Sequence, residues 1–144
     1  MEGPKEVIVV DASIIAKWFV EEEYSENALR LREDYRSRKI DVWSTQLMPF
    51  EVLNALRYNR AFSIGDLKKA AKALNNYRIA LHPILNELTE LCITNAMKYG
   101  ITIYDSSYVS LSVLLNKQFY TADRRLTEKA REIDLVHHIV QYSK

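Results

Sequence analysis

Four consecutive β-branched residues, Val7 to Val10, form the most informative run in the chain. A strand with an apolar side chain at every position, and not only at every second one, is typical of a sheet that is covered on both faces. Both faces are covered when helices connect parallel strands and pack on either side of them. The run therefore predicts an α/β fold in which residues 7–10 form the first and central strand.

The remainder of the chain alternates between helical and strand-like segments. The apolar spacing and the turn residues predict helices at residues 12–20, 25–38, 47–61, 64–81, 86–100, 106–115 and 126–131. Further strands are expected at 42–43, 118–121 and 136–140, whereas 101–104 fits either a short strand or an extended link. Because strands alternate with helices throughout, we expect one domain over residues 1–144, with a parallel sheet flanked by helices.

Several predicted helices begin at residues that commonly cap a helix. Ser63 with Asp66 resembles a capping box in which aspartate replaces glutamate. Ser44 or Thr45 can cap the third helix, and Asn86 is expected to cap the fifth.

Several classes of protein are disfavoured. Cys92 is the only cysteine, so neither an internal disulfide nor a thiolate zinc site can form. No run of eighteen apolar residues is present, and the first apolar run is too short for a signal peptide, so we expect a cytoplasmic protein that does not use a membrane. The chain has neither a G-x-x-x-x-G-K nor a G-x-S-x-G segment, and it lacks the second aspartate, two positions after Asp11, of phosphoaspartate-forming hydrolases.

Four acidic residues occur where a carboxylate would lie at the edge of the predicted sheet. They are Asp11 after VIVV, Glu51 at the start of an apolar helix, Asp105 after ITIY and Asp123 within FYTAD. The carboxyl ends of strands face the crevice in which open α/β sheets bind their ligands. Carboxylates that converge there without histidine or thiolate would suit Mg²⁺ or Mn²⁺. The pattern predicts a metal-dependent enzyme that cleaves phosphodiester bonds.

Each of these acids also has a simpler explanation. Asp11, Asp105 and Asp123 each precede a helical segment, where aspartate often serves as a cap. Glu51 either faces a cleft or points to water along a thin polar stripe, and its apolar neighbours favour the cleft. Ser13 could orient Asp11 or hold a metal-bound water, although it is also a routine residue for a first helical turn. Taken jointly the acids favour a site, because four clustered carboxylates repel one another without a cation.

Basic residues concentrate between positions 57 and 78. Six bases and one acid give this segment a local charge of about +5 by count, although the whole chain carries only +1. Such a cluster could bind RNA phosphates, and the alternative is a solvated helix face. The residues considered for RNA binding are Arg57, Arg60, Lys68, Lys69 and Lys72.

Four segments, in this order, closely resemble the acidic motifs of PIN-domain ribonucleases, and especially of VapC-type toxins from toxin-antitoxin pairs. The segments are VIVVDASIIAKWFVEEE, PFEVLNAL, IYDSSYVSL and FYTADRRL, and the likeness extends from Val7 to about Val140. The resemblance implies a three-layer α/β/α sandwich with a central parallel sheet, Mg²⁺ or Mn²⁺ as cofactor and RNA as substrate. It also implies a small antitoxin protein as partner, and we expect a homodimer.

The resemblance further assigns roles to particular residues. It implies that Asp11, Glu51, Asp105 and Asp123 hold the metal. It also implies that the hydroxyls of Ser13 and Thr121 orient these ligands without binding the metal themselves. Two other functions stay open at this point. One is a house-keeping nuclease that processes RNA, and the other is a non-catalytic module that binds a cation and RNA.

Overall fold

The chain folds around a five-stranded sheet in which every pair of neighbouring strands is parallel. The computed structural model describes residues 5–143, and its strands are β1 (Glu6–Val10), β2 (Ile40–Thr45), β3 (Ala80–His82), β4 (Gln118–Thr121) and β5 (Val136–His138). Across the sheet their order is β3, β2, β1, β4, β5. β1 is thus the central strand, as predicted, and Ile8, Val9 and Val10 are completely buried.

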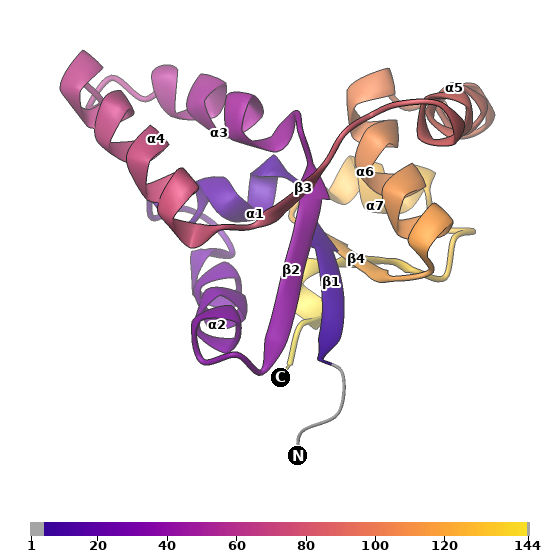
Figure 1. Cartoon of the computed structure of the whole chain (residues 1–144), viewed down its shortest axis with the longest axis horizontal. Helices are drawn as coiled ribbons and strands as arrows, with labels where there is room; N and C mark the ends of the chain where they lie inside the picture. Colours follow the sequence, from indigo (N-terminus) through magenta and orange to yellow (C-terminus); the bar gives the residue numbers. More distant parts are fainter. Residues whose placement is uncertain (1–4, 144) are drawn as a thin grey trace.

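Helices cover both faces of this sheet. They are α1 (Ala12–Ala16), α2 (Ser25–Arg36), α3 (Met48–Arg57), α4 (Ile64–Tyr77), α5 (Glu87–Tyr99), α6 (Ile103–Leu115) and α7 (Arg124–Lys129), and a 3-10 turn, η1 (Ile139–Gln141), follows β5. In Figure 1, α1 to α4 lie on one side of the sheet and α5 to α7 lie on the other. The three-layer α/β/α arrangement confirms the predicted fold class.

The order of the strands reverses beside β1. From β1 the chain moves outward through β2 to β3, and it then returns to place β4 on the opposite side of β1. In open α/β sheets, ligands bind at the carboxyl ends of the strands next to such a reversal. Val10 of β1 pairs with Tyr120 of β4, so the residues that follow these two strands leave the sheet side by side.

The largest difference from the sequence prediction lies at the end of α4. The apolar pattern predicts a helix to Leu81, but α4 ends at Tyr77 and the unpredicted strand β3 follows. Arg78 adopts a left-handed backbone conformation with φ of 55°, and this stops the helix. β3 is a short edge strand whose Ala80 and Leu81 are exposed, so it lacks the apolar run that reveals a buried strand.

Several other boundaries also differ from the prediction. The predicted helix at 12–20 ends at Ala16, because the N–H groups of Trp18 and Phe19 bond three residues back and make turns in place of a longer α-helix. The helices predicted to end at 38 and 61 end at Arg36 and Arg57. The last strand, predicted to reach Val140, ends at His138, and η1 begins at the next residue.

The segment 101–104 is neither a strand nor a simple link. Thr102 caps α6, which begins at Ile103, and the Thr102 hydroxyl accepts a hydrogen bond of 3.0 Å from the N–H of Asp105. Asp105 therefore lies in the first turn of a helix and does not follow a strand. The short strand that was one of the two possibilities for 101–104 is therefore absent, and Asp105 does not stand at a strand-to-helix junction.

The predicted caps have mixed outcomes. The capping box of Ser63 and Asp66 is present with both of its hydrogen bonds. Asn86 precedes α5 but makes no capping bond with its side chain. The residue before α3 is Leu47, whose N–H donates to the hydroxyl of Thr45 over 3.3 Å, so Thr45 supports this helix start from outside the cap position. Cys92 is buried. Among residues 5–143, no helix has the length and apolar character needed to cross a membrane.

Candidate active site at the carboxyl edge of the sheet

The four predicted acids line one cavity of about 450 Å³ where β1 and β4 end. Asp11 directly follows β1, Asp123 follows β4 by two residues, and Glu51 and Asp105 come from the first turns of α3 and α6. Four separate segments therefore bring one carboxylate each to the reversal point of the sheet. The structure places together the acids that the sequence nominates one by one.

Asp11 serves both as a helix cap and as a wall of the cavity. Its Oδ1 accepts hydrogen bonds from the N–H of Ser13 over 3.1 Å and from the Ser13 hydroxyl over 2.6 Å. Its Oδ2 accepts a bond of 2.5 Å from the hydroxyl of Thr121. Capping α1 therefore does not remove this carboxylate from the cavity.

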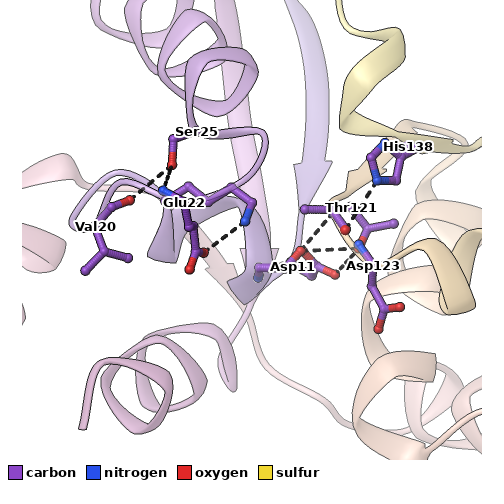
Figure 2. A network of polar contacts seen from close by, with 10 residues as sticks. Asp11, Val20, Glu22, Ser25, Thr121, Asp123 and His138 are labelled. Carbon is purple, nitrogen blue, oxygen red and sulfur yellow. Dashed lines mark hydrogen bonds and ion pairs between the residues drawn. The ribbon is translucent and has the colours of Figure 1, made fainter. Parts of the chain in front are cut away.

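The hydroxyls of Ser13 and Thr121 connect the ends of β1 and β4. Figure 2 shows Thr121 beside Asp11 and Asp123. The two hydroxyl oxygens lie 3.3 Å apart. The Ser13 hydroxyl also accepts the N–H of Ala122 over 2.9 Å, and the Thr121 hydroxyl accepts the N–H of Asp123 over 3.1 Å. These bonds fix the Asp11 carboxylate and the backbone that leads to Asp123.

Replacing Ser13 or Thr121 by alanine is expected to lower the rate of substrate cleavage by about 10-fold to 100-fold without abolishing it, the usual cost of losing a residue that orients a ligand. The matched control is Thr94→Ala, which removes a hydroxyl that bonds only within α5 and should leave the rate unchanged. Rates are compared at saturating divalent cation, alongside thermal melts. Complete loss with either single variant would mean that the hydroxyl acts directly on the substrate or the metal.

Glu51 has a partner that the sequence pattern did not reveal. The Tyr108 hydroxyl donates a hydrogen bond to Glu51 Oε1, and Tyr108 itself is only 1% exposed. Burial, followed by the neighbouring Glu51, raises the pKa of Tyr108 far above its ordinary value of 10, so the phenol stays a proton donor. The available signal is the spacing from Asp105, because residues three apart lie on the same side of a helix.

Two of the acids, Asp11 and Asp105, have raised pKa values. Burial raises the pKa of Asp11 to about 6, although the bonds from Ser13 and Thr121 act in the opposite direction. The pKa of Asp105 is raised by burial and then by the charges of Asp123 and Glu51. An electrostatic environment of this kind favours a cation.

The donor set is made of carboxylate oxygens, without histidine or thiolate, and this is the chemistry that hard divalent cations select. Within residues 5–143, however, no three side chains of His, Cys, Asp or Glu are grouped so that they could hold a metal ion together as they stand. The fit to a cation therefore rests on the type of donor and on the raised pKa values of Asp11 and Asp105.

Two charged residues of the cavity are absent from the sequence prediction. Lys17 and Glu22 line it beside Asp11 and form an ion pair of 2.9 Å. The available signal for Lys17 is its place within IIAKWF, where a lysine follows apolar and small residues and precedes two aromatic ones.

All five basic residues predicted to bind RNA are exposed, but none of them lines the acidic cavity. Arg57 and Lys68 border a groove between α3 and α4, and Lys69 borders a different cavity that includes Phe62. The structure thus gathers the acids at one place and leaves the bases exposed on α3, on α4 and on the link between these helices.

Comparison with known proteins assigns the chain to a family. The PIN domain family model matches residues 8–132. Ribonuclease VapC3 of Pyrobaculum aerophilum is 33% identical over 132 residues, which cover 85% of this chain and 93% of that protein.

Two solved structures share the fold. One is a toxin-antitoxin complex from Klebsiella pneumoniae, with a TM-score of 0.68 and 14% identity over 92% of this chain and 97% of that one. The other is VapC20 of Mycobacterium tuberculosis, described as a Sarcin-Ricin loop cleaving toxin, with a TM-score of 0.64 and 15% identity over 84% of this chain and 93% of that one. This chain therefore belongs to the PIN-domain family and is a relative of the VapC ribonucleases.

Proposed function

We propose that this chain is an endoribonuclease that requires Mg²⁺ or Mn²⁺ and hydrolyses RNA phosphodiester bonds. The observation that carries the proposal is the meeting of four carboxylates, each from a separate segment, in one cavity at the reversal of the sheet. The relationship to Ribonuclease VapC3 supports RNA as the substrate class.

The four acids of the cavity and the hydroxyls that bond to them have roles in this proposal. Asp11, Glu51, Asp105 and Asp123 would hold the divalent cation. A bound cation of this kind supplies charge neutralisation at the phosphate and activation of water. Hydrogen bonds to Asp11 hold its carboxylate in one orientation before the substrate arrives, and the bond from Tyr108 does the same for Glu51.

The test is cleavage of a single-stranded RNA by the purified chain with Mg²⁺, with Mn²⁺ and with a chelator. We expect cleavage with the cations and none with the chelator. Undiminished cleavage in the chelator would contradict the proposed cation dependence. Tight RNA binding without cleavage under any of these conditions would favour a non-catalytic binding module.

We also propose that the chain acts as the toxin of a toxin-antitoxin pair and that it forms a homodimer. A structural neighbour from Klebsiella pneumoniae is a toxin-antitoxin complex, which supports an antitoxin partner. Large apolar side chains that partners would cover are exposed, among them Phe50, Ile64 and Met97.

Expression of the chain should arrest growth, and co-expression of a small neighbouring reading frame should relieve the arrest. Normal growth despite an active enzyme would favour a house-keeping nuclease.

The basic surface of α4 is proposed to contribute to RNA affinity and not to the chemistry. Changing Lys68, Lys69 and Lys72 together to glutamine should raise the RNA dissociation constant at moderate salt and leave cleavage at saturating RNA near normal. For each phosphate that is no longer neutralised by a lysine, the slope of log affinity against log salt should become shallower by about 0.7 for single-stranded RNA. The measurement is a binding titration at several salt concentrations.

Three other lysines provide a control with the same change of charge. Lys5, Lys39 and Lys117 directly precede β1, β2 and β4, at the edge of the sheet opposite the acidic cavity. Their triple change to glutamine should have a smaller effect on affinity. Equal effects of the two triple variants would show that only the total charge matters, and an unchanged salt slope in the α4 variant would show that α4 does not bind RNA.

A further inference from the structure

Lys17 is a buried cation inside an otherwise acidic cavity. The residue is the C-cap of α1 and is only 9% exposed. The described residues that line the cavity include five carboxylates, and Lys17 is the one among them with a positive charge. α1 carries Asp11 at its first end and Lys17 at its last, so a single short helix sets the spacing between these opposite charges.

Hydrogen bonds within its own loop fix the position of Glu22, the partner of Lys17. Glu22 Oε1 accepts from Lys17 Nζ over 2.9 Å. The N–H of Glu22 donates to the Ser25 hydroxyl over 2.8 Å, and this hydroxyl donates to the carbonyl of Val20 over 3.1 Å. Figure 2 shows this loop next to Asp11 and Thr121. The loop therefore keeps one carboxylate in front of the buried amine.

The two members of the ion pair differ in their contact with water. The Lys17 side chain is 9% exposed and that of Glu22 is 47% exposed. A buried ammonium requires an anionic or polar partner, but a partner that is half in water gains little from the contact. Another anion that enters the cavity can therefore replace Glu22 at small cost, and Lys17 remains in place to receive it.

We propose that Lys17 binds a phosphate of the RNA, with its Nζ donating to a non-bridging oxygen that takes the place of the Glu22 carboxylate. This inference rests on the proposed ribonuclease function. A phosphodiester that approaches the acids experiences repulsion from each of them, and one fixed ammonium with three donors offsets part of it. Lys17 would thus position the substrate, while Glu22 would keep the ammonium paired when no RNA is bound.

The experiment compares Lys17→Met with Glu22→Gln, both combined with Asp11→Asn so that the RNA stays intact during binding. Lys17→Met should raise the dissociation constant of a single-stranded RNA by about 10-fold to 100-fold, the range for one charge-assisted contact. It should also reduce the salt slope by about 0.7. Glu22→Gln should bind RNA as tightly as the parent or more tightly, because it frees the ammonium and removes an acid. Lys17→Arg, which keeps the charge, should restore most of the affinity.

A purely structural ion pair predicts a different pattern. Removing either partner would then weaken RNA binding and lower the melting temperature to the same extent, and this result would overturn the inference. If Lys17→Met does not fold, Glu22→Gln decides the matter alone, since weaker RNA binding by this variant contradicts the exchange of anions.

Cleavage assays without the Asp11 change separate this inference from the proposed function. Should the wild-type chain cut RNA while Lys17→Met cuts and binds it equally well, the ribonuclease proposal stands and the role of Lys17 is wrong. A wild-type chain that neither binds nor cuts RNA overturns both proposals.

Discussion

Asp11→Asn is expected to abolish RNA cleavage while leaving the fold intact. Asparagine keeps the shape of the side chain and can still accept the bonds that cap α1, but it lacks the charge that would hold a cation. The expected loss exceeds about 100-fold, the upper range for residues that only orient a ligand. The measurement is RNA cleavage with Mg²⁺ and Mn²⁺ beside a thermal melt.

The same variant should be more stable than the wild type when no divalent cation is present. Because the pKa of Asp11 is raised from 3.8 to about 6, ionising its carboxylate at pH 7 costs the folded chain about 3 kcal/mol. Asparagine avoids this cost, so the melting temperature should rise. Added divalent cation should stabilise the wild type more than the variant.

A second buried aspartate provides the matched control. Asp34 lies outside the acidic cavity and accepts a hydrogen bond from the buried hydroxyl of Tyr142. Asp34→Asn should keep wild-type cleavage and should not stabilise the chain. A well-folded Asp11→Asn protein with substantial activity would remove Asp11 from the site.

The pKa of Asp11 also predicts how stability depends on pH. The folded chain retains the Asp11 proton up to about pH 6, whereas the unfolded chain loses it near 3.8. Between these values the folded state binds more protons, so the contribution of Asp11 to the free energy of unfolding falls as the pH rises from about 4 to about 6. Melts of the wild type should show a decline across this window, in the absence of divalent cation, that Asp11→Asn does not show.

Cation binding should follow the opposite trend, because a divalent ion must displace the proton from Asp11. Apparent affinity for the cation should increase up to about pH 6 and level off above it, and below pH 6 it should fall by about 10-fold per unit. The measurement is the rise in melting temperature caused by Mg²⁺ or Mn²⁺ at about pH 5, 6 and 7. An affinity that does not change over this range would show that Asp11 is not a ligand.

The predictable part of the fold is the part that is buried in a regular pattern. Residues 7–10 are apolar at each position because helices cover both faces of β1, and this identifies the strand and its central place. β3 leaves no such signal, since an edge strand of three residues has too little buried surface to impose a pattern. The end of α4 depends on the left-handed backbone of Arg78. Glycine is the residue type that usually indicates this conformation, so an arginine at the position gives no signal in the sequence.

The site also has residues that the sequence pattern identifies and residues that it does not. Asp11 and Asp123 could be identified because they follow buried strands, and the edge of a parallel sheet is where such residues meet. Tyr108 and Lys17 could not be identified in this way, because their roles depend on partners 57 and 5 residues away that only the folded chain brings into contact. Their side chains are long, and the sequence does not determine which neighbour the polar end reaches.

The pairing of β1 with β4 also determines when, during protein synthesis, the cavity is completed. Asp11 is made early, but the hydroxyl that bonds its Oδ2 is 110 positions further along the chain. Until β4 has been made and has docked, β1 is an open edge of the sheet, and the carboxylate of Asp123 is missing from the cavity. Under the proposed function, a growing chain cannot attack the RNA of the ribosome that is making it, and the protein becomes a nuclease only when its sheet has closed around β1.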